Sequence, residues 1–70
     1  MKIGMMYFDK SNLPLSTKIR NAIDYYQKKY GTIPNKIMVN PKDYQDCKEF
    51  AIETSKHIPI HNIWLGMNEE

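Results

Sequence analysis

IRNAIDYYQKKYG, residues 19–31, is the stretch that decides the fold. Its apolar residues recur at intervals of three and four, so they fall along one side of a helix. Gly31 suits the left-handed residue that ends a helix, and Lys28 and Lys29 in the last turn complement the negative end of the helix dipole. We therefore expect a helix over residues 16–30 whose apolar stripe consists of Ile19, Ala22, Ile23, Tyr26 and Tyr30.

The residues before this helix predict a strand and a turn. Residues 2–8 are almost entirely apolar or aromatic, which is typical of a strand that is covered on both faces. Residues 9–14 gather turn formers, and Ser16 or Thr17 can cap the helix by accepting a hydrogen bond from a backbone N–H group of its first turn.

After the helix, Pro34 prevents its continuation, and residues 37–39 form a short apolar run that predicts a second strand. If that strand is parallel to the first, the helix makes a right-handed crossover between them. Asn40 followed by Pro41 is a helix-start signal, because Asn caps well and Pro suits the first helical position.

The extent of this second helix is ambiguous. Tyr44, Cys47, Phe50 and Ala51 fit a helix that continues to about residue 55, whereas the alternation of Phe50, Ile52 and Thr54 fits a strand. We favour a helix over residues 41–48 and a strand over residues 50–54, which leaves residues 49–55 open between the two interpretations.

The end of the chain predicts a loop and a final strand. Residues 55–61 contain Pro59 and two histidines, and residues 63–65 form an apolar run that Gly66 ends. The expected order is β-α-β-α-β-β. The fold class is therefore α+β or α/β, a single small domain over residues 1–70 with one main helix packed on a small sheet.

Composition narrows the classes of protein further. Seventy residues leave room for one core of marginal stability, which favours help from oligomerisation. A net charge of +2 gives only a weak bias towards nucleic acid. The single cysteine, Cys47, suits a reducing compartment, so we expect a cytoplasmic protein, and no apolar run is long enough to cross a bilayer.

The residues that could carry chemistry form no convincing site. Cys47, His57 and His61 are possible zinc ligands, but they lack the close cysteine pair and the fourth ligand of a structural zinc site. Asp9 follows the first strand, where α/β enzymes hold metals or phosphoryl groups, although such an Asp more often opens a turn. We expect no metal, no cofactor and no catalytic residue, and a small enzyme or metal-binding protein remains an alternative.

The last strand is the stronger candidate for a contact surface. His61 and Trp64 belong to a segment that would offer unpaired backbone groups if it lay at a sheet edge. This favours a small protein-interaction domain that forms a homodimer or docks on a larger protein. The competing interpretation is that Trp64 closes the core over the helix.

A second alternative is a nucleic-acid-binding accessory protein. Tyr25 lies at the edge of the helical stripe, and Lys28 and Lys29 are nearby, so an aromatic ring and two cations could contact nucleic-acid bases and phosphates. Such a basic helix face is also typical of an ordinary solvated surface.

Four short motifs carry a resemblance to known proteins. They are YYxxKYG at residues 25–31, PN at 34–35, VxP at 39–41 and HxxWLG at 61–66. In this order they resemble a series in a group of small uncharacterised prokaryotic proteins. The resemblance covers most of the chain from residue 15, implies no activity, and implies a strand before the final motif, which supports the shorter second helix.

Overall fold

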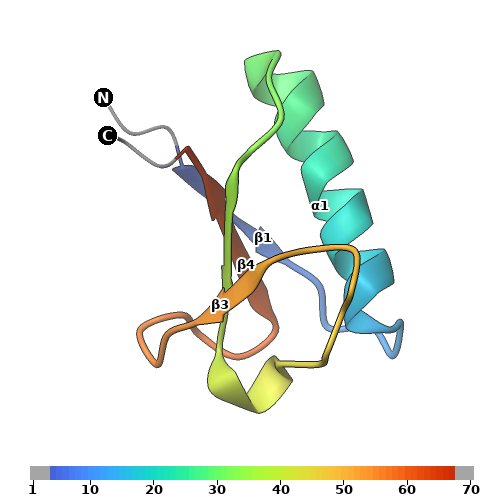
Figure 1. Ribbon diagram of the computed structural model, residues 1–70, viewed down its shortest axis with the longest axis vertical. Helices are drawn as coiled ribbons and strands as arrows, with labels where there is room; N and C mark the ends of the chain where they lie inside the picture. The colour runs from blue at the N-terminus through green and yellow to red at the C-terminus, as the bar shows by residue number, and fades with distance from the viewer. Residues whose placement is uncertain (1–3, 68–70) are drawn as a thin grey trace.

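One helix packs on one face of a four-stranded mixed sheet, which makes the chain a single α+β domain (Figure 1). The computed structural model describes residues 4–67, so residues 2 and 3 of the first expected strand lie outside it. The elements in chain order are β1 (Gly4–Phe8), α1 (Leu15–Tyr30), β2 (Lys36–Val39), the 3-10 turn η1 (Pro41–Asp43), β3 (Ile52–Thr54) and β4 (Asn62–Gly66).

The sheet order is β1-β4-β2-β3, so the last strand lies inside the sheet. β4 is antiparallel to both neighbours, and β2 and β3 are parallel. β1 and β2 therefore run in the same direction but are separated by β4. The expectation that the last strand could lie at a sheet edge is wrong, because the edges of this sheet are β1 and β3.

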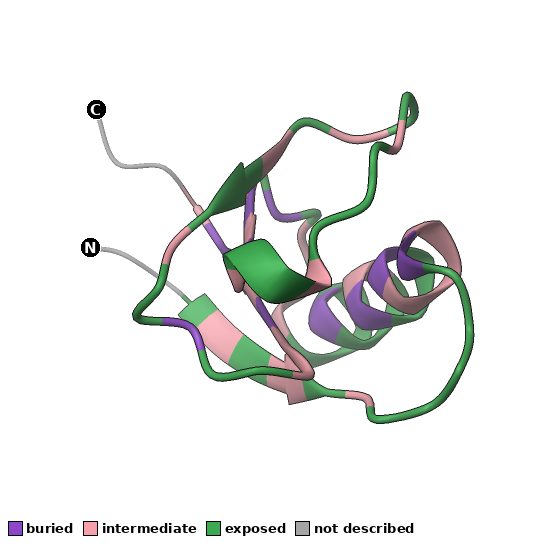
Figure 2. Cartoon of the chain, turned by 90° about the horizontal axis from the view of Figure 1, so that it is seen from below, coloured by how far each residue is buried: buried purple, intermediate pink, exposed green. Residues whose placement is uncertain are grey.

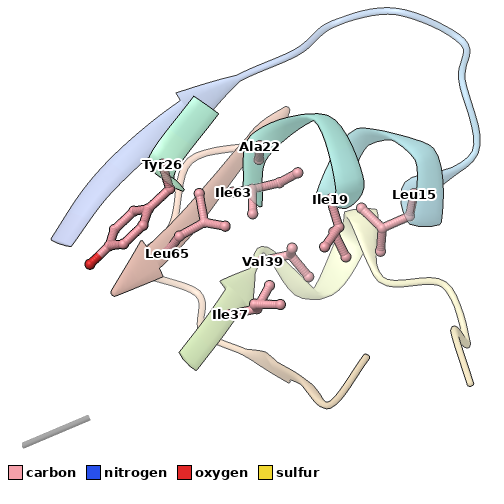
Figure 3. Packing of buried hydrophobic residues seen from close by; sticks show 8 residues of the cluster. All are labelled: Leu15, Ile19, Ala22, Tyr26, Ile37, Val39, Ile63 and Leu65. Carbon is pink, nitrogen blue, oxygen red and sulfur yellow. The ribbon is translucent and has the colours of Figure 1, made fainter. Parts of the chain in front are cut away.

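The helical stripe is confirmed. Ile19, Ala22 and Tyr26 are buried, while Ile23 and Tyr30 are half-buried and pack against the same cluster. Figure 2 shows the buried residues of α1 along one side of the helix. Figure 3 shows how this side meets the sheet, with eight residues forming the core: Leu15, Ile19, Ala22, Tyr26, Ile37, Val39, Ile63 and Leu65.

The two ends of α1 are held differently. Gly31 has the expected left-handed conformation with φ 75°, and its N–H donates to the Gln27 carbonyl at 2.7 Å. The first turn has no cap from Ser16 or Thr17, contrary to expectation. Instead, the Gln45 side chain accepts a hydrogen bond from the Leu15 N–H at 3.0 Å, so a distant segment caps the helix.

The second helix is much shorter than expected. Asn40 caps a single 3-10 turn by accepting a hydrogen bond from the Lys42 N–H at 2.8 Å, and the chain turns extended at Tyr44. The expected helix over residues 41–48 is therefore wrong. Residues 44–51 form no helix, and in this stretch Cys47 and Phe50 pack against the core, with the Phe50 N–H donating to the Cys47 carbonyl in a turn. The strand that the alternating pattern indicated over residues 50–54 is present but shorter, as β3.

The two faces of the sheet differ. Ile37, Val39, Ile63 and Leu65 point towards α1 and are buried, and the alternate residues of each strand point to the other face because side chains alternate along a strand. β1 alternates between exposed and half-buried residues. The expectation that the first strand is covered on both faces is therefore wrong, and we call the uncovered side the helix-free face. No helix among residues 4–67 is long and apolar enough to cross a membrane.

Replacement of Gly66 by Ala tests the packing on the helix-free face. A methyl group at Gly66 would overlap the Trp64 ring, so the ring must move. We expect Gly66→Ala to lower the free energy of unfolding by about 1–3 kcal/mol and to shift the Trp64 fluorescence to longer wavelength. In a Trp64→Leu background the same substitution should cost much less, and equal costs in the two backgrounds would contradict this packing.

Candidate functional site

The outer edge of β1 is open to solvent on its hydrogen-bonding side. The Asp9 N–H donates to the His61 carbonyl at 2.9 Å, in register with the β1–β4 pairs. Since the direction of backbone groups alternates along a strand, Met5 and Tyr7 direct theirs to β4. Gly4, Met6 and Phe8 direct theirs outward, where β1 has no neighbouring strand among the described residues.

On the helix-free face, a row of apolar side chains crosses three strands. Trp64 on β4 pairs with Met6 on one side and with Met38 on the other. Gly4 lies beside the Trp64 ring so closely that a Cβ there would be 2.5 Å from Trp64 Cζ2. Met6 is 46% exposed and Phe8 is 62% exposed, so the row ends in exposed apolar surface at the β1 edge.

The placement of Trp64 settles its two competing interpretations. Its neighbours Ile63 and Leu65 point towards α1, so the Trp64 ring lies on the opposite face. Trp64 therefore does not close the core over the helix. It is half-buried, and the two glycines beneath its ring allow it to lie flat on the sheet.

On the helix side of the β1 edge there is a shallow hollow. The ring of Tyr7 from β1 meets the ring of Tyr25 from α1 edge-to-face, with 6.0 Å between their centroids. Lys28 Nζ lies 3.3 Å from Asp24 Oδ2, and both side chains are largely exposed. The hollow is lined by Tyr7, Asn21, Asp24, Tyr25, Lys28 and Lys29.

The structure therefore brings together three of the five predicted site residues. Tyr25, Lys28 and Lys29 line the hollow, whereas Trp64 lies on the opposite face of the sheet. His61 immediately precedes β4, and its ring meets the exposed Phe8 ring edge-to-face, with 6.5 Å between the ring centroids. All five surround the β1 side of the molecule, but they do not converge on one point.

His61 also belongs to a set of loops at one end of the sheet. Its backbone is left-handed, with φ 71°, and its N–H donates to Asp43 Oδ2 at 2.7 Å. These loops surround a cavity of about 170 Å³ near the ends of β1 and β2, lined among others by Asp9, Lys18, Lys42, Asp43 and His61. One oxygen of each aspartate accepts a backbone N–H of the chain itself, so both carboxylates anchor loops.

Cys47 and His57 do not join this cavity. Burial raises the pKa of the Cys47 thiol, and the charges of Asp46 and Glu49 raise it further, so the thiolate is disfavoured at neutral pH. Within the part of the chain that the structure describes, no group of three or more His, Cys, Asp and Glu residues could hold a metal ion.

Sequence reasoning missed Met6 and Phe8 as exposed residues and Tyr7 as a residue that lines the hollow. Taken alone, the run of apolar residues in β1 predicts a strand covered on both faces, but the sequence contains only one long amphipathic helix. A helix about 10 Å wide covers about two strands spaced 4.8 Å apart. That shortage of covering helix is the signal that could have identified the open side of β1.

Comparison of the chain with protein-family models, with curated proteins and with solved structures gave no match. The resemblance inferred from the four motifs therefore stays a prediction. So do the nucleic-acid-binding and enzymatic alternatives.

The loop after β1 gives a pH-dependent prediction. Hydrogen bonds from the hydroxyl and the backbone N–H of Ser11 hold the pKa of Asp9 below its ordinary value of 3.8. Since the folded pKa is the lower one, the stabilisation is complete above the unfolded value and is lost as pH falls through the folded value. We expect carboxyl NMR titration to show a depressed Asp9 pKa that rises in Ser11→Ala. The exposed neighbour gives the control Asn12→Ala, and an equal rise in both variants would contradict the assignment.

Proposed function

We propose that this chain is a small protein-interaction domain that receives an extended segment of another polypeptide along the outer edge of β1. The observation that carries the proposal is that β1 is an unguarded edge. Exposed edge strands are normally protected by charged residues, proline, bulges or extreme shortness. β1 has five residues, GMMYF, without a charge or a proline.

The other edge of the sheet supports this proposal by contrast. β3 has only three residues, and the middle one is Glu53. Its Oε1 atom lies 3.8 Å from Nζ of Lys36 on the neighbouring strand. A short, charged strand is a poor template for strand addition. The two edges of the same sheet thus differ in the property that governs pairing with another chain.

Side chains on both faces of β1 could contact an added strand. On the helix-free face, Met6 and Phe8 are exposed apolar groups, and burial of such surface contributes about 25 cal/mol per Å². On the helix side, the Tyr7–Tyr25 hollow lies where alternate side chains of an added strand would point. Backbone hydrogen bonds supply affinity in this mode of recognition, and the pockets for alternate side chains supply specificity.

The test uses a fluorescein-labelled peptide with the sequence of residues 2–10, KIGMMYFDK, and fluorescence anisotropy against dilute protein. We expect binding in the micromolar to millimolar range, which is typical of a short segment that must be ordered on binding. Met6→Pro should abolish binding, because it removes an outward N–H without removing a β1–β4 hydrogen bond.

Thr54→Pro is the matched control. Ser55 N–H donates to the Val39 carbonyl, so the N–H of Thr54 points away from β2 and its loss leaves the sheet intact at the opposite edge. This variant should bind the peptide like the original protein. Circular dichroism verifies that both variants fold. If Met6→Pro does not fold, a synthetic protein that is N-methylated at Met6 replaces it. Unchanged binding after loss of the Met6 N–H would refute strand addition at β1.

A further inference from the structure

We infer that the partner of the β1 edge is a second copy of this chain, joined antiparallel through β1 so that the two α1 helices lie side by side over one continuous sheet. This inference rests on the proposed function, since it names the partner of the same site. Three features of the β1 side support it. They are the outward residues of β1, the position along β1 at which Tyr25 of α1 contacts Tyr7, and the arrangement of charges on α1.

The outward residues of β1 form a self-complementary strand. With a two-fold axis at Met6, the Met6 residues of the two copies face each other, and Gly4 of each copy faces Phe8 of the other. Outward-facing residues in such pairs exchange two backbone hydrogen bonds. Phe8 then lies opposite a residue without a side chain, beside the Trp64 ring that covers Gly4. The most exposed aromatic ring of β1 thereby gains an aromatic neighbour on the helix-free face.

The Tyr7–Tyr25 contact fixes where the two helices meet. It places Tyr25 beside Tyr7, one residue from the two-fold axis at Met6. Each α1 remains over its own sheet. In the dimer, three strand spacings separate the two β4 strands, so helices that each lie over their own β4 are on the order of 14 Å apart. This gap is wider than a close helix contact of 8–10 Å, but long side chains from both helices can span it. The hollow beside β1 becomes the seam between the helices.

Charges in the seam are complementary between copies. The two-fold axis makes the helices antiparallel, with residue 25 close to the crossing point. Asp24 of one copy then lies on the same side of that point as Lys28 and Lys29 of the other, offset from them by only about 3–5 Å along the helix axis. Within one copy, Asp24 and Lys28 already lie on the same side of α1, 3.3 Å apart. The contact between Asp24 of one copy and the lysines of the other occurs twice in the dimer, because the interface is isologous. A polypeptide without acidic residues at this position would add no counter-charge to Lys28 and Lys29, of which Asp24 of the same copy pairs with Lys28.

The test exploits this pattern with two seam variants. Asp24→Lys makes the seam wholly cationic, and the double variant Lys28→Asp/Lys29→Asp makes it wholly anionic. By sedimentation equilibrium, the original chain should form dimers. Each variant alone should raise the dimer dissociation constant by about tenfold or more, since opposed pairs become repulsive twice per dimer. An equimolar mixture of the two variants should recover a heterodimer of nearly original affinity.

Matched controls change the same charges elsewhere. Asp46→Lys and Lys48→Asp/Lys56→Asp alter exposed residues outside the hollow and should leave dimerisation unchanged. A chain that stays monomeric at all concentrations but binds the KIGMMYFDK peptide overturns the second-copy partner while strand addition stands. Dimers that respond to loss of the Met6 N–H but not to the seam variants overturn the helix arrangement. If the protein neither binds the peptide nor forms dimers, strand addition at β1 itself is overturned.

Discussion

The structure depends on how much sheet a single amphipathic helix can cover. The stripe on α1 from Leu15 to Tyr26 is buried against β2 and β4, and this packing creates the only continuous core among the described residues. A helix about 10 Å wide cannot also cover both edges of a four-stranded sheet or its second face. The exposed apolar side chains of β1 follow from that shortage of covering structure.

The two edges of the sheet, β1 and β3, differ in how far other segments cover them. Next to α1, the segment that joins η1 to β3 packs against the core through Cys47 and Phe50, and Gln45 from the same segment caps α1. No comparable segment among residues 4–67 lies along β1, where the open backbone groups, the Met6 and Phe8 side chains and the Tyr25 hollow are found. The asymmetry between the edges leaves the exposed apolar side chains of the sheet on the β1 side. For this reason the proposed function and the proposed partner both concern β1.

The sequence was sufficient where local rules decide the structure. Spacings of three and four residues predicted the stripe of α1, and Gly31 predicted its end, because both features depend on neighbouring residues. The sequence was insufficient where distant residues decide. Nothing near Trp64 reveals that β4 enters the sheet between β1 and β2, since strand order depends on pairing across the whole chain. Asn40 and Pro41 start a helical turn that ends at Asp43, and the segment that follows contacts the core through Cys47 and Phe50, which local propensity could not predict.

The same distinction applies to the candidate site. The positions of Tyr25, Lys28 and Lys29 beside the helical stripe predict them as site residues, and they line one hollow in the structure. Trp64 and His61 were selected for an edge that proved to be in the middle of the sheet. The edge that is open was overlooked, because apolar residues on both sides of β1 resemble a fully covered strand. Their exposure became evident only once the single helix was placed over the other strands.

The most direct test of the account is amide hydrogen exchange along β1, measured by NMR on a dilute, monomeric sample. If the chain leaves the outer edge of β1 uncovered, protection should alternate. The amides of Met5 and Tyr7 should exchange slowly because they bond to β4, and those of Met6 and Phe8 should exchange nearly as fast as in an unfolded chain. Equal, strong protection at all four positions would show that the chain covers its own edge and would contradict the account.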